Sequence, residues 1–132
     1  MYYANCSMIN GNWIMKKNIT QSKTYAFAIR IVELYKLITI ERKEYVLSKQ
    51  LLRSGTSIGA NVSEANGGIS KADFSSKISI AYKEALETKY WLSLLHDTGY
   101  IQKEKFDKLI LDCDEICKIL FSILKSTERI KQ

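Results

Sequence analysis

Hydrophobic residues recur at helical spacing in four long segments of the chain. In residues 22–39, Phe27, Ile31, Leu34 and Ile38 follow the i, i+4, i+7, i+11 spacing of a helix with one apolar face. Residues 44–66, 71–97 and 103–129 repeat this pattern. Four long helices joined by short connections predict an all-α fold, namely an antiparallel up-down-up-down four-helix bundle.

The segments between these helices set the expected boundaries. Residues 1–20 show no sustained period and are predicted to form a flexible N-terminal tail, so the bundle domain is expected over residues 21–132. Ser22 is a candidate N-cap for the first helix, and residues 39–43 are expected to form a short polar connection. Gly67 and Gly68 are expected to end the second helix with positive φ, and Ser70 to cap the third.

The middle of the second helix is rich in small residues. Gly55 and Gly59 lie four positions apart within the run Ser54-Gly55-Thr56-Ser57-Ile58-Gly59-Ala60. Glycine disfavours a helix interior by up to ~1 kcal/mol, so the helix either breaks here or packs closely against a neighbour. We favour a continuous helix.

The third and fourth helices carry a second apolar stripe beside the one that a bundle core requires. Extra apolar area of this kind is typical of a subunit interface, so we predict a homo-oligomer. The predicted interface residues are Tyr82, Leu86, Tyr90, Leu94, Leu109, Ile116 and Ile123.

Composition excludes several classes of protein. The chain has 132 residues, 46% of them hydrophobic, and no proline, which suits one folded helical domain. No apolar run approaches the roughly 20 residues of a membrane span, and the first residues lack the order of a secretory signal. We therefore expect a cytoplasmic protein with no membrane partner.

The residue types that catalysis requires are scarce. A di-metal bundle needs Glu-x-x-His pairs, but no histidine follows Glu84 or Glu87, and the only histidine is His96, expected to be exposed at a helix end. Cys113 and Cys117 have no partner cysteine or histidine pair nearby and are interpreted as core residues. We predict no metal, no cofactor and no enzyme activity.

Charge points to a binding role. The formal net charge is +6, and residues 1–43 hold seven basic residues against two acidic ones. This excess favours an anionic partner, nucleic acid first, although a solubility role explains it equally well. The candidate nucleic-acid contacts are Arg30, Lys36, Arg42, Lys43 and Lys49. Arg53 is a further candidate for phosphate, but an ion pair across the bundle is favoured for it.

Three motifs give the chain a family resemblance. They are the run Arg53-Ser54-Gly55-Thr56-Ser57-Ile58-Gly59-Ala60-Asn61, then Glu84-Ala85-Leu86-Glu87-Thr88, and then Thr98-Gly99-Tyr100-Ile101. Over about residues 22–125 the chain resembles the bacterial four helix bundle protein family. Its members are encoded within intervening sequences of 23S rRNA genes, and the accessory variability protein of diversity-generating retroelements is related to them. The resemblance implies a ring, commonly a homopentamer, without enzyme activity. It also implies that retroelement members bind a reverse transcriptase and its RNA through a basic surface.

Together these observations predict a non-enzymatic oligomeric binding or adaptor protein. It is expected to contact nucleic acid, or a partner that processes nucleic acid, through a basic surface. The alternative is a protein–protein scaffold module in which the charge serves solubility only.

Overall fold

The structure, a computed structural model, describes residues 11–127, and side chains from residue 19 onward. Its long helices are α1 (Gly11–Leu37), α2 (Leu47–Asn66), α3 (Lys71–Asp97) and α4 (Lys103–Ser126), and a short π-helix, η2 (Ile38–Arg42), follows α1 directly. Residues 11–127 contain no strand. The predicted all-α class with four long helices is therefore confirmed.

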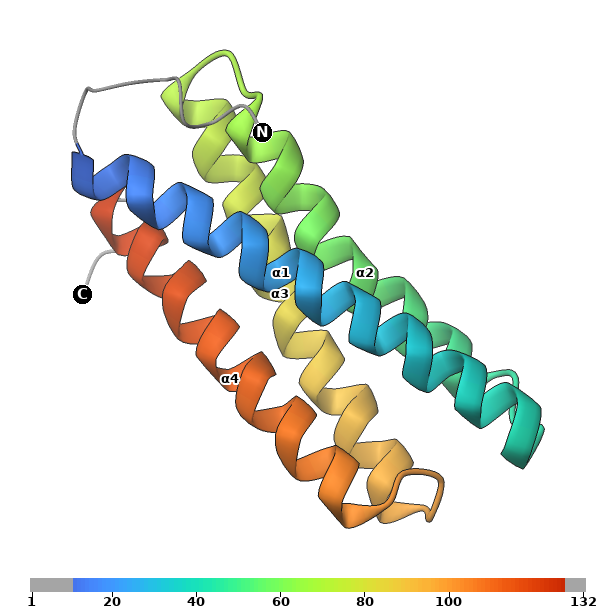
Figure 1. The fold of residues 1–132 in the computed structure, drawn as a ribbon. Coiled ribbons are helices and arrows are strands. Elements are labelled where there is room, and N and C mark those ends of the chain that lie inside the picture. The colour runs from blue at the N-terminus through green and yellow to red at the C-terminus, as the bar shows by residue number, and fades with distance from the viewer. Residues whose placement is uncertain (1–10, 128–132) are drawn as a thin grey trace.

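The helices lie side by side along one long axis (Figure 1). The α1–α2 and α3–α4 connections lie toward one end of the molecule, and the α2–α3 connection lies toward the other. α2 packs against both α1 and α3, and α4 packs against α3, whereas α1 and α4 contact each other least among neighbouring helices. None of the described helices has a stretch both long and apolar enough to cross a bilayer.

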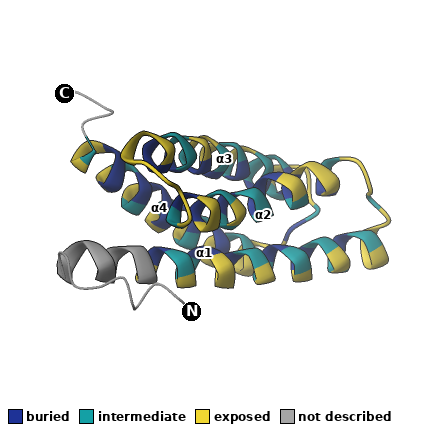
Figure 2. Cartoon of the chain, turned by 90° about the horizontal axis from the view of Figure 1, so that it is seen from above, coloured by how far each residue is buried: buried dark blue, intermediate teal, exposed yellow. Residues whose placement is uncertain are grey.

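The core is built from the inward faces of all four helices, and the exposed positions face outward (Figure 2). Fully buried side chains include Ile31 of α1, Ile58 of α2, Leu92 of α3 and Leu120 of α4. Each such side chain contributes about 1.5–3 kcal/mol through removal from water. The apolar stripes predicted from spacing are therefore the surfaces that hold the bundle together.

The first helix is longer than its apolar pattern predicts. It begins at Gly11, so Ser22 lies inside the helix and is not an N-cap, and residues 11–20 are helix rather than tail. Polar residues are tolerated in its interior because their hydroxyls bond the helix itself. Thr24, which is buried, donates to the carbonyl oxygen of Thr20 at 2.8 Å. The part of the predicted tail in residues 1–10 lies outside the described residues.

α2 is continuous through its small residues, as predicted. A Cβ on Gly55 would lie 2.9 Å from both γ carbons of Ile31, and one on Gly59 would lie 3.2 Å from the carbonyl oxygen of Thr24. The two glycines therefore let the backbones of α1 and α2 approach each other closely.

The two ends of α2 are terminated in different ways: glycines follow its C-terminus, and a carboxylate caps its N-terminus. Gly67 has φ −95° and Gly68 does not have positive φ either, so the positive φ predicted for this pair is wrong; among the described glycines it occurs at Gly99 (90°). At the other end, the Glu44 carboxylate accepts hydrogen bonds from the backbone N–H groups of Val46, Leu47 and Ser48 at 2.8–3.0 Å. Burial raises the pKa of Glu44, but these donors outweigh it, so its pKa lies below the ordinary value.

The start of α3 is capped as predicted. The Ser70 hydroxyl accepts a hydrogen bond from the N–H of Asp73 at 3.0 Å. Gly68 is closely packed here, because a Cβ would lie 3.1 Å from the carbonyl oxygen of Ala65. α3 then runs over the predicted residues 71–97.

Candidate nucleic-acid interface

The predicted basic contacts divide into two groups by their partners. Arg30 of α1 forms an ion pair with Asp112 of α4, and Arg53 of α2 pairs with Glu84 and Glu87 of α3. Their charge is therefore already matched within the chain. The favoured interpretation of Arg53 as an ion-pairing residue is confirmed.

The other basic contacts surround the α1–α2 connection. Lys36, Lys43 and Lys49 are exposed, and none of the three has an ion-pair partner within the described part of the chain. Arg42 donates to the carbonyl oxygen of Gly99 at 2.7 Å, and its guanidinium lies 5.1 Å from the centre of the Tyr100 ring. Arg42 thus ties the α1–α2 connection to the α3–α4 connection. We call residues 36–49 the basic end.

The backbone of the basic end departs from regular helix. The segment expected to be a polar connection begins as the π-helix η2, and Lys43 then adopts φ 52°. This left-handed conformation costs a residue with a Cβ about 1–2 kcal/mol and is usually filled by glycine. Lys43 is the only non-glycine residue with positive φ in residues 11–127.

Three large apolar side chains project from the basic end, and sequence analysis missed them. Ile40 and Val46 are each 71% exposed, and Tyr45 is 57% exposed. The sequence did offer one indication of them. Apolar residues stand on both sides of the polar run Glu41–Glu44, at positions that do not continue the apolar stripe of the first helix. Apolar side chains among unpaired lysines form a surface that suits a ligand with both apolar and anionic parts.

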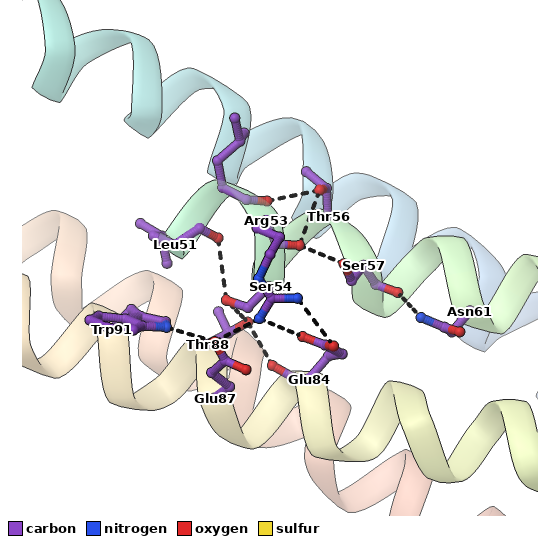
Figure 3. A network of polar contacts seen from close by, with 11 residues as sticks. Leu51, Arg53, Ser54, Thr56, Ser57, Asn61, Glu84, Glu87, Thr88 and Trp91 are labelled. Carbon is purple, nitrogen blue, oxygen red and sulfur yellow. Dashed lines mark hydrogen bonds and ion pairs between the residues drawn. The ribbon is translucent and has the colours of Figure 1, made fainter. Parts of the chain in front are cut away.

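A polar network joins α2 to α3 (Figure 3). Arg53 Nη2 lies 2.6 Å from Glu87 Oε2, which also accepts a hydrogen bond from the Trp91 indole N–H at 2.9 Å. These bonds, from Trp91 first and then Arg53, hold the pKa of Glu87 below its ordinary value. The same contacts act in the opposite direction on the base: hydrogen bonds to Glu87 and Glu84 raise the pKa of Arg53.

Beneath this network a buried hydroxyl pair crosses the helix interface. Thr88 Oγ1 donates to Ser54 Oγ at 2.9 Å, and both side chains are fully buried. Glu84 Oε1 is also buried. Arg53 Nη2 lies 3.3 Å from it, close enough for charge attraction, but forms no directed hydrogen bond with it. The network is mainly a structural clamp between α2 and α3.

The predicted interface residues of α3 and α4 have different surroundings. Leu86 is 44% exposed and Tyr90 is 59% exposed, and Tyr82 and Leu94 are half-buried beside them. By contrast, Leu109, Ile116 and Ile123 are buried within the single chain. This corrects the expectation for these three residues, because residues of both apolar stripes of α4 are buried in the core of the single chain.

The remaining reactive side chains lie in structural positions. His96 is not simply exposed as expected: it stacks on Phe106 with ring centres 4.3 Å apart, and its Nδ1 lies 2.9 Å from the carbonyl oxygen of Ile101. Cys113 and Cys117 are buried, as predicted. Hydrogen bonding to Cys117 and burial raise the pKa of Cys113. Residues 11–127 hold no group of three or more histidine, cysteine or acidic side chains placed to bind a metal.

The fold and these side chains define a small all-α four-helix bundle protein with a lysine-bearing, partly apolar end. A family model described as 23S rRNA-intervening sequence protein matches residues 16–122. The chain belongs to this family, which confirms the resemblance.

The comparison with solved structures agrees with the family assignment. A crystal structure of a protein of unknown function from the S23 ribosomal protein family of Bacteroides thetaiotaomicron is 54% identical to this chain. The match covers 83% of this chain and 98% of that one, with a TM-score of 0.82. The comparison with curated proteins gives no match.

Proposed function

We propose that the chain is a non-enzymatic oligomeric adaptor that binds nucleic acid through its basic end. In this proposal its unit is an antiparallel up-down-up-down bundle working in the cytoplasm. The observation that carries the proposal is the grouping of Lys36, Lys43 and Lys49, exposed and without ion-pair partners, around one connection. Phosphates are the partners that unpaired lysines bind without needing a fixed geometry.

Filter binding to RNA and to DNA over a salt series tests this proposal. We expect binding that weakens steeply as salt rises, with a slope set by the number of phosphates neutralised. Replacing Lys36, Lys43 and Lys49 together by glutamine should reduce that slope. The matched control replaces Lys105, Lys108 and Lys118, which are exposed on α4, and should change it less. Absence of binding at low salt would remove the proposal.

The oligomer is expected to be a homopentamer, on the strength of the family resemblance alone. The exposed apolar face of α3 supports self-association, because Leu86 and Tyr90 would gain burial there. Light scattering should give a multiple of 15.2 kDa, and Leu86→Asp together with Tyr90→Asp should shift it toward the monomer. A monomeric parent protein at high concentration would contradict the assembly.

The second candidate function is a scaffold that binds only proteins, such as a reverse transcriptase. The internal pairing of Arg30 and Arg53 favours it, because those charges are not free for phosphate. Capture of a defined partner that survives nuclease treatment, by a protein that binds no nucleic acid, would support this candidate over the first.

A further inference from the structure

We infer that the basic end selects single-stranded nucleic acid, with Tyr45 stacking on an unpaired base while Lys36, Lys43 and Lys49 contact the flanking phosphates. This inference rests on the proposed nucleic-acid function and adds the class of ligand. Three features support it: the exposed apolar side chains, the strained backbone and the unpaired charge.

The apolar side chains distinguish a single strand from a duplex. Tyr45, Ile40 and Val46 are 57–71% exposed, so their apolar surface remains in contact with water. In a duplex the base faces are stacked on one another and only the backbone and base edges can be reached. Unpaired bases present their faces, and these stack on aromatic side chains with little dependence on sequence.

The backbone conformation indicates that the side chain at position 43 has a functional role. Lys43 has φ 52°, where glycine would avoid the cost of a Cβ, and it directly follows a π-helical turn. π-helical turns are frequent at functional sites, and strained residues gather there. The lysine at this glycine-favouring position is exposed, and the exposed Tyr45 follows it two residues further along the chain.

The charge at this end is arranged to attract an anion. Residues 36–49 hold four basic residues against Glu41 and Glu44, and the Glu44 carboxylate accepts hydrogen bonds from three backbone N–H groups at the start of α2. The three lysines have no such partners. A single strand of nucleic acid has phosphates that the lysines can bind and planar bases that can pack on the exposed apolar side chains.

Fluorescence anisotropy with the full chain tests this inference. The probes are a labelled unstructured 20-nucleotide RNA, the DNA of the same sequence, and the matching duplex. We expect both single strands to bind at least tenfold more tightly than the duplex. Comparing RNA with DNA then shows whether the sugar contributes. Equal or tighter binding of the duplex would overturn the inference while leaving the proposed function intact.

Variants assign the effect to the named side chains. Tyr45→Ala should weaken single-strand binding by about 5- to 100-fold and Tyr45→Phe should preserve it, because stacking needs the ring and not the hydroxyl. Tyr25→Ala is the matched control, since Tyr25 is 67% exposed on α1 outside the basic end. If the two alanine variants behave alike, the inference fails.

Lys43→Gly separates binding from folding. Glycine suits the left-handed backbone, so the melting temperature should be retained or raised, while the slope of log affinity against log salt should fall by about 0.7 for one lost phosphate contact. An unchanged slope would overturn the role of Lys43.

Vesicles of phosphatidylcholine with phosphatidylserine are the last probe and should bind weakly. Binding tighter than that of the single strands would assign this end to a membrane surface instead. If the parent protein binds no probe at all, the proposed function fails with it.

Discussion

Replacing Gly55 by alanine tests the close approach of α1 and α2 through the sign of one free-energy change. At an unhindered helix position, this replacement stabilises a protein by up to ~1 kcal/mol. At Gly55 the new Cβ would lie 2.9 Å from both γ carbons of Ile31, which is fully buried. These carbons are bonded to the Ile31 Cβ, itself only 3.3 Å away, and cannot swing clear.

The expected magnitude follows from these two opposing effects. Overpacking of a core costs about 1–3 kcal/mol, which exceeds the helix-propensity gain. The net loss in the free energy of unfolding is therefore about 1 kcal/mol, or roughly 3–5 °C in melting temperature for a chain of this length. Urea denaturation followed by circular dichroism measures it, at one fixed protein concentration because oligomers gain stability with concentration.

Two further variants isolate the contact. Ala60→Gly, at an exposed position of the same helix, measures the propensity effect alone and should cost about 1 kcal/mol. Ile31→Ala removes both γ carbons, so adding Gly55→Ala in that background should be neutral or stabilising. If Gly55→Ala stabilises the parent protein by about 1 kcal/mol, the argument for close helix approach is refuted.

Three other predictions concern the helix ends, the ion pairs and the core. Glu44→Gln should cost about 0.5–2 kcal/mol at pH 7 by weakening the cap of α2. Because the folded pKa of Glu44 is lowered, its contribution is present above the unfolded pKa and is lost as pH falls through the folded pKa, so parent and variant should converge in acid. Arg53→Met should cost about 1–2 kcal/mol, since Arg53 and Glu87 are partly exposed, and this loss should also shrink in acid as Glu87 is protonated. Leu109→Ala should cost about 2–5 kcal/mol in thermal unfolding, because Leu109 lies in the core; a loss confined to oligomer size would return it to the subunit interface.

The spacing of apolar residues predicts where the helices lie better than it predicts which surfaces their apolar stripes pack against. The third helix was predicted to the residue, because Ser70 and Gly99 give strong local signals at its ends. The start of the first helix was missed, because residues 11–20 lack the apolar period on which the prediction depends. The second stripe of α4 could not be assigned from spacing, since periodicity gives the width of an apolar face and not the number of helices that cover it.

The candidate site was predictable in part. Arg53 was expected to pair across the bundle, because a long cationic side chain near carboxylates on a packed neighbour seldom remains free. The prominence of Tyr45 was not predicted, because its exposure follows from η2 and from the conformation of Lys43. Both are backbone features that residue spacing does not encode.

The seam between α1 and α4 determines how this bundle can open. It is crossed by the ion pairs Lys23–Glu115 and Arg30–Asp112, all partly exposed, and a groove beside it is lined by both apolar and charged residues. The other neighbouring pairs are held by more extensive packing. The α1–α4 seam is therefore where the bundle opens with the least loss of packing between helices. Added salt screens the exposed pairs at this seam and those between α2 and α3 and between α3 and α4 alike, so the difference in packing, not charge, decides which seam opens first.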